Sequence, residues 1–286
     1  QEIVALVQEK FLELERLERL IAAVGTGDFT AASVAMYGRP STQDVEDARG
    51  ILERWADVSR PEPARDAAAL AQALRTRLQE LSIDLRVIED PILTTEVAVN
   101  AAARTIRIRP DLRCADVQIA RLVVHEVDVH AVRIHNGGQT PWAVLELGTA
   151  GYLETEEGLA VHRERETGSL YPYQEKLYAA RCVAVHVALS EGFSAVFEEL
   201  RPYLDDDTAL ALAFRVKRGL SDTSQPGALT KESHYFSGPR RIRRFLDGGG
   251  AIDTLYGAKI ALEHAPQLEA LIGRGLIDPN RWTRPS

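Results

Sequence analysis

The stretch Arg121-Leu-Val-Val-His-Glu-Val-Asp-Val-His-Ala-Val-Arg133 decides how this chain folds around its chemistry. It places two histidines and a glutamate inside an apolar run. Downstream, Thr155-Glu-Glu-Gly-Leu-Ala160 offers carboxylates at the start of another helical pattern. A zinc hydrolase needs two imidazoles and a third protein ligand, which leave one coordination position open for water, and a further carboxylate that takes the proton of that water. The two segments together predict a catalytic zinc site.

The spacing of the two histidines predicts a distorted helix. On a regular α-helix, side chains five residues apart, such as those of His125 and His130, point about 140° away from each other and could not face one metal ion. One inserted residue in a single-turn π-bulge would return both to the same side, and such bulges are frequent at functional sites. The alternative is a buried helix that happens to contain these residues, although glutamate is seldom fully buried unless it is paired. The motif by itself leaves both interpretations open.

The two motifs also resemble those of a known family. His125-Glu-Val-Asp-Val-His130, followed by Gly151-Tyr-Leu-Glu-Thr-Glu-Glu-Gly-Leu-Ala160, is similar to the QEGLA-motif proteins, which include the microtubule-associated tyrosine carboxypeptidases. The resemblance implies a zinc carboxypeptidase of the glutamate-ligand (gluzincin) type, which acts on the C-terminus of a peptide or protein. It covers most of the chain, because further similar patches lie at Tyr37-Gly-Arg-Pro40, Arg215-Val-Lys-Arg-Gly-Leu220, Leu229-Thr-Lys231 with Tyr235, and Gly257-Ala-Lys-Ile260.

Matched residue by residue, the resemblance implies a role for each polar residue of the two motifs. His125, His130 and Glu157 would bind Zn²⁺, and Glu126 would act as the general base. Glu126 would take the proton of the attacking water and then pass it to the leaving amine.

Two residues depart from the usual family pattern. Glu156 stands where many members have glutamine, but glutamate also occurs there in the tubulin-processing members. Asp128 stands where the family usually has glycine, so a charged side chain occupies a position where a small residue would ease the bulge. Asp128 therefore motivates one alternative, an inactive zinc-binding relative. The other alternative is an endopeptidase or maturation protease that acts on one dedicated peptide.

Cationic side chains in the C-terminal part are candidates for binding the substrate. A carboxypeptidase must recognise a terminal carboxylate, and arginine does so with paired hydrogen bonds. Tyr235 or His234 could donate a hydrogen bond to the oxyanion that forms on the attacked carbonyl. The alternative for each cation is a solvated helix face. The candidate substrate-binding residues are Arg215, Lys217, Arg218 and Lys231.

Hydrophobic periodicity predicts an α+β fold that is mostly helical. Alternating segments over residues 83–89, 95–100 and 105–109 predict a small, antiparallel sheet. Helices over residues 112–134 and 152–166 carry the two motifs. We expect the sheet to pack on this zinc-binding helix pair in the gluzincin-like metallopeptidase architecture that the resemblance implies. Residues 1–82 would form an N-terminal helical part and residues 83–286 the catalytic part, in one continuous compact unit.

The composition is that of an ordinary globular chain of 286 residues. A net charge of −8 argues against general nucleic-acid binding, which usually shows a basic footprint. No run approaches the roughly 18 to 20 apolar residues of a membrane span, and no signal peptide is visible. Two cysteines, Cys114 and Cys182, indicate no disulfide framework. We therefore expect a cytoplasmic protein that has no nucleic-acid or membrane partner.

Overall fold

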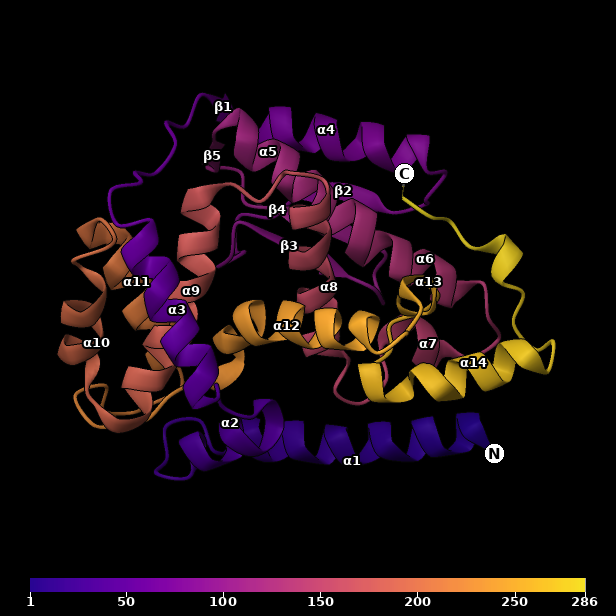
Figure 1. The fold of residues 1–286 in the computed structure, drawn as a ribbon, viewed down its shortest axis with the longest axis horizontal. Coiled ribbons are helices and arrows are strands. Elements are labelled where there is room, and N and C mark those ends of the chain that lie inside the picture. The colour runs from indigo at the N-terminus through magenta and orange to yellow at the C-terminus, as the bar shows by residue number, and fades with distance from the viewer. Residues whose placement is uncertain (286) are drawn as a thin grey trace. The chain divides into compact units, whose positions relative to one another are not determined.

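The chain forms two compact units, each built from segments that are not contiguous in sequence. The computed structural model describes residues 1–285. One unit contains Gln1–Lys10, Pro61–Leu170 and the C-terminal stretch from Arg241, and the other contains Phe11–Arg60 and Tyr171–Arg240. Helices α1 (Glu2–Ala22) and α12 (His234–Asp247) contribute residues to both units. Figure 1 labels the helices and strands along the chain. Helices predominate and strands are short, which confirms the prediction of a mostly helical α+β fold.

The first unit holds all the strands and both motif segments. Its elements besides α1 and α12 are β1 (Arg65–Asp66), α4 (Ala67–Glu80), β2 (Arg86–Glu89), β3 (Val97–Asn100), β4 (Thr105–Ile108), β5 (Arg113–Cys114), α5 (Asp116–Val123), the π-helix η1 (Val124–Ala131), α6 (Val132–Gly138), α7 (Ala143–Leu147), α8 (Tyr152–Glu166), α13 (Ile252–Tyr256), the 3-10 helix η3 (Leu262–His264), α14 (Ala265–Gly273) and the 3-10 helix η4 (Pro279–Arg281).

The main sheet has the strand order β2-β4-β3. Strands β3 and β4 pair antiparallel, as predicted, but β2 pairs with β4 in parallel, so the prediction of an antiparallel sheet is wrong for that pair. The reason is burial. Ile106 and Ile108 of β4 are fully buried, so β4 takes the central position and β2 pairs along its other edge. Residues 90–96 then lead from the end of β2 to the start of β3. Strands β1 and β5 form a separate antiparallel pair.

Helices α5, η1 and α6 follow one another without a break. The run begins at Asp116 rather than near Leu112, because Arg113 and Cys114 are taken up by pairing with β1. The π-helix contacts α8, α4 and β3. Val127 and Val129 of η1 are fully buried in the same apolar cluster as the isoleucines of β4. The motif segment therefore lies inside the core of the first unit.

The second unit is helical and is organised around α9. Ala179, Ala180, Ala184 and Ala188 of α9 are fully buried, and α3, α10 and α11 pack on this helix. The sequence pattern predicts one long helix over 173–200, but the helix is interrupted at Gly192, where an added Cβ would collide with the carbonyl of Ser224. The remaining elements are α2 (Phe29–Tyr37), α3 (Thr42–Arg54), α9 (Pro172–Ser190), α10 (Phe193–Leu200), α11 (Asp206–Lys217) and the 3-10 helix η2 (Thr230–Ser233).

No helix within residues 1–285 combines the length and the apolar character needed to cross a membrane.

Candidate metal centre

The π-helix η1 brings the two motif histidines together. Its hydrogen bonds reach five residues along the chain, so residues five apart lie on the same side of the helix. The ring centroids of His125 and His130 are 4.7 Å apart and the rings are nearly perpendicular, at 87°. The predicted distortion is thus confirmed, and it extends over the eight residues Val124–Ala131 rather than a single inserted one.

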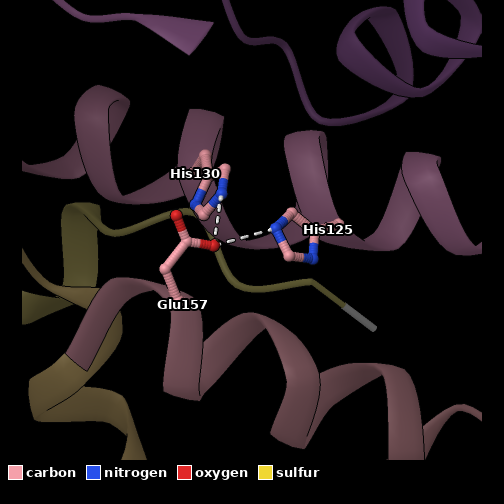
Figure 2. Close-up of side chains that lie close together, drawn as sticks. All are labelled: His125, His130 and Glu157. Atoms are coloured by element: carbon pink, nitrogen blue, oxygen red, sulfur yellow. Dashed lines mark hydrogen bonds and ion pairs between the residues drawn. The ribbon is translucent and has the colours of Figure 1, made fainter. Parts of the chain in front are cut away.

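Glu157 of α8 completes the group from the facing helix. Its Oε2 lies 3.3 Å from Nε2 of His125 and 4.0 Å from Nε2 of His130. Figure 2 shows both rings directed at this carboxylate. One donor atom from each of the three buried residues lies within 4.8 Å of the others. Helix α8 has the predicted bounds, Tyr152–Glu166, so its first turns present Glu157 to η1.

Glu126 lies beside this group without being part of it. Its Oε2 is 4.0 Å from Nε2 of His130, and the residue is buried. In the structure three donors thus converge, and one further carboxylate lies next to them.

The far nitrogen of His125 is held by a second carboxylate. Nδ1 lies 2.7 Å from Oε1 of Glu164, a fully buried residue of α8 that also accepts a hydrogen bond of 3.0 Å from Arg121. Metal-binding histidines usually donate their other ring N–H to such a carboxylate, which fixes the tautomer and the ring orientation. Nε2 of His125 is left facing Glu157.

Charge in this cluster favours a cation. Burial lowers the pKa of His125, but hydrogen bonds from its ring to Glu157 and Glu164 outweigh burial and raise the pKa to about 10. A positive charge is therefore stabilised between the two carboxylates. Two imidazole nitrogens and one carboxylate oxygen are a common donor set for catalytic zinc, so the residues present fit that ion.

Glu156, next to Glu157 in α8, forms ion pairs with Arg133 and Lys259 instead of joining the donor group. Burial raises its pKa, but Lys259, Arg133 and His130 outweigh burial and hold the pKa of Glu156 well below its usual range. It is therefore a carboxylate that faces fixed cations, and it leaves the converging position to Glu157.

The unusual Asp128 is paired with an arginine. Its Oδ1 accepts a hydrogen bond of 2.7 Å from Nε of Arg77 in α4, and its side chain is buried. Asp128 is absent from the converging donor group. Arg77 of α4 thus neutralises the charge of Asp128 within the first unit.

The predicted substrate-binding cations lie in the second unit. Arg215 and Arg218 contact Oε1 of the buried Glu232, at 2.9 and 3.5 Å, and Arg181 contacts its Oε2 at 3.6 Å. Lys217 does not join them. Its ammonium group donates hydrogen bonds to the carbonyls of Ala188, Glu191 and Gln225, and burial lowers its pKa to about 8. Lys231 is half-buried in η2.

The two candidate oxyanion donors also have contacts within the second unit. The ring of Tyr235 stacks on Tyr178, with centroids 5.4 Å apart, and the guanidinium of Arg181 lies 4.3 Å from its centroid. Nε2 of His234 contacts the carbonyl of Tyr37 at 2.8 Å and therefore carries the proton, because a carbonyl only accepts hydrogen bonds.

Several residues of the centre are not identified by the sequence patterns. Glu164 is one of them, although it lies seven residues after Glu157 and so falls on the same face two turns along an α-helix. Arg133 and Lys259 fall within the conspicuous segments but have no predicted role. No local sequence pattern indicates that the side chains of Arg133 and Lys259 point toward Glu156.

Comparison with known proteins agrees with the motif resemblance. The family model described as "Microtubule-associated tyrosine carboxypeptidase" matches residues 1–286. Microtubule-associated tyrosine carboxypeptidase 1 of Homo sapiens is 28% identical over 234 residues, which cover 74% of this chain and 48% of the relative. The protein of the same name from Rattus norvegicus is 30% identical over 165 residues, covering 55% and 34%. Putative tyrosine carboxypeptidase MATCAP2 of Homo sapiens is 31% identical over 131 residues, covering 43% and 24%.

These matches span about half the length of the curated relatives, or less. The family model, by contrast, covers the chain from its first residue to its last. The chain belongs to the microtubule-associated tyrosine carboxypeptidase family.

Proposed function

We propose that this protein is a zinc-dependent metallocarboxypeptidase of the glutamate-ligand class, which hydrolyses the C-terminal peptide bond of a peptide or protein. The observation that carries the proposal is the convergence of His125, His130 and Glu157, whose donor atoms lie within 4.8 Å of one another in the core. The names of the relatives support the reaction class and make a C-terminal tyrosine the first residue to test.

The residues of the centre divide the chemistry between them. Bound zinc would supply a Lewis acid and lower the pKa of a water molecule. The Glu126 carboxylate lies beside the donors and outside their set, so it is free to act as a base. It accepts a proton from the attacking water and later donates that proton to the nitrogen of the leaving residue. Burial of Glu126 limits competing contact with bulk solvent.

Asp128 does not count against catalysis. The alternative of an inactive relative was motivated by an additional charge between the two histidines in sequence. Because Arg77 binds that charge, Asp128 neither joins the donors nor stands unpaired in the core. This pairing supports an active centre.

The proposal is tested by metal analysis together with mass spectrometry of a peptide library. The purified protein should carry about one zinc per chain and should remove single residues from peptides that have a free C-terminus. Matched peptides with an amidated C-terminus should remain intact. Internal cleavage, or equal cleavage of the amidated peptides, would establish the endopeptidase alternative instead, and a chain that binds no zinc would refute the proposal.

A further inference from the structure

Glu156 is the meeting point of a buried ion cluster behind His130. Its Oε1 lies 2.9 Å from Nζ of Lys259 and 3.2 Å from Nδ1 of His130. Its Oε2 accepts a hydrogen bond from Arg133. Glu156 and these three partners are all buried. Both oxygens of Glu156 are thus occupied by groups of the first unit.

The two cations that hold Glu156 are themselves fixed by the backbone. Arg133 is fully buried, and its remaining N–H groups donate to the carbonyls of Leu255, Ala258 and Ile260, at 2.8, 3.0 and 2.7 Å. The amide of Lys259 donates to the carbonyl of Leu145 at 2.9 Å. The segment 255–260 therefore ties α6 and α7 together and sets the position of the Lys259 ammonium group.

The orientation of the His130 ring depends on which group its Nδ1 contacts. This buried nitrogen has no partner that meets hydrogen-bond geometry in residues 1–285, although Oε1 of Glu156 is only 3.2 Å away. Its other nitrogen, Nε2, faces Glu157 (Figure 2). A neutral imidazole carries one proton, so a proton on Nδ1 leaves the lone pair of Nε2 available to a metal ion. The 3.2 Å separation is already within hydrogen-bond distance, and catalytic hydrogen bonds are often poorly aligned until a site is loaded.

We propose that Glu156, held in place by Lys259 and Arg133, is the positioning residue of His130: it keeps the proton on Nδ1 and aims Nε2 at the metal site. The inference rests on the proposed function, because it assumes that His130 is a ligand. It gives the two adjacent glutamates of α8 different tasks, since Glu157 meets the metal and Glu156 orients a ligand. It also assigns the 255–260 segment to the support of that ligand.

The experiment measures zinc affinity by competition with a chelator, and the tautomers of His125 and His130 by ¹⁵N NMR of the zinc-free protein. Glu156→Ala should weaken zinc binding about 10- to 100-fold, as loss of an outer partner of a ligand typically does. It should also move the proton of His130 away from Nδ1, while the ring of His125, which Glu164 holds, should keep its wild-type ¹⁵N shifts. Glu157→Ala should abolish zinc binding.

Further variants separate positioning from folding. Lys259→Met should act in the same direction as Glu156→Ala but less strongly, because Arg133 still holds the carboxylate. Lys176→Met, a matched change at a buried lysine of the second unit that donates to three backbone carbonyls, should lower thermal stability without altering zinc affinity. If Glu156→Ala does not fold, the double variant Glu156→Leu with Lys259→Met replaces it, because it removes one cation together with the anion.

Two results are decisive. Wild-type zinc affinity and an unchanged His130 tautomer in the Glu156 variants, beside a Glu157→Ala protein that binds no zinc, would overturn the inference and leave the proposed function standing. A wild-type protein that binds no zinc would refute the proposed function. The His130 tautomer in the zinc-free protein would still show whether Glu156 controls the proton.

Discussion

The candidate metal centre of the first unit and the Glu232 cluster of the second unit both bury several charges, but their partners differ. In the first unit, the carboxylates of Glu157 and Glu164 meet the imidazole of His125, at 3.3 and 2.7 Å. In the second unit, the ion pairs of Glu232 are with the guanidinium groups of Arg181, Arg215 and Arg218. The Glu232 cluster sets three guanidinium groups against one carboxylate, and burial of the carboxylates alone does not distinguish the two regions.

The difference lies in what each partner can exchange. An arginine in a protein does not lose its proton, so the Glu232 cluster is an arrangement of fixed charges. An imidazole can give up a proton and bind a metal ion through the same nitrogen. The type of cationic partner, rather than the density of buried charge, therefore marks the cluster that could bind a metal ion.

The largest expected effect is on turnover in the first region. Glu126→Gln should lower the rate of peptide hydrolysis by at least about 100-fold, because general-base catalysis contributes factors of this size. Zinc content should stay at the wild-type level, since Glu126 lies outside the donor group. Rate assays and metal analysis on the same preparation check this. Glu263→Gln, an exposed glutamate of the same unit, is the control, and full activity of Glu126→Gln would end the assignment of the base.

The next effect tests the second region as a structural cluster. Glu232→Gln leaves three arginines around a neutral amide and should lower the free energy of unfolding by about 2–3 kcal/mol, less than for a fully buried ion pair because the arginines are partly exposed. Zinc content should not change. Urea denaturation gives the free energy, and metal analysis gives the zinc content. Loss of zinc from this variant would contradict the comparison, because the second cluster would then support the metal centre.

A smaller effect is expected where Asp128 meets Arg77. Arg77→Met leaves the buried Asp128 carboxylate without this partner, and should lower the free energy of unfolding by about 2 kcal/mol because Arg77 is itself partly exposed. Adding Asp128→Gly removes the stranded charge and should recover part of the loss. Denaturation of the single and double variants measures the coupling. If Asp128→Gly alone gains hydrolytic activity over the wild type, that result would instead support the alternative that Asp128 inactivates the enzyme.

The smallest effect is a pH dependence that comes from Lys217. Burial lowers the pKa of this lysine from 10.5 to about 8 in the folded protein. Between these two values the unfolded chain binds more protons than the folded one, so the contribution of Lys217 to stability rises as the pH rises. Lys217→Met should lower stability at every pH, because three carbonyls lose a donor, and should remove this rise. Urea denaturation at about pH 7.5 and about pH 10.5, on either side of this range, measures both. A Lys217→Met protein that keeps the full wild-type rise would exclude this lysine as its source.

Local patterns in the sequence were enough for much of the centre. The five-residue spacing of His125 and His130 predicted a π-helical distortion, because only that backbone brings both rings to one side, and η1 confirms it. The bounds of α8 were also predicted correctly, since its periodicity and ends are encoded by neighbouring residues. The family was predicted from the same two motifs and is confirmed over residues 1–286.

Other features depended on residues that are distant in sequence. The sequence by itself determined most of the segments that become helices or strands and which residue types gather at the candidate metal site, because hydrogen bonding along a helix and alternation along a strand are local. Only the tertiary structure decided that β4 lies between β2 and β3, that Gly192 interrupts a helix against Ser224, and that Lys259 neutralises Glu156. These choices follow from which surfaces bury each other and which buried charges must find a partner, and no short stretch of sequence specifies either.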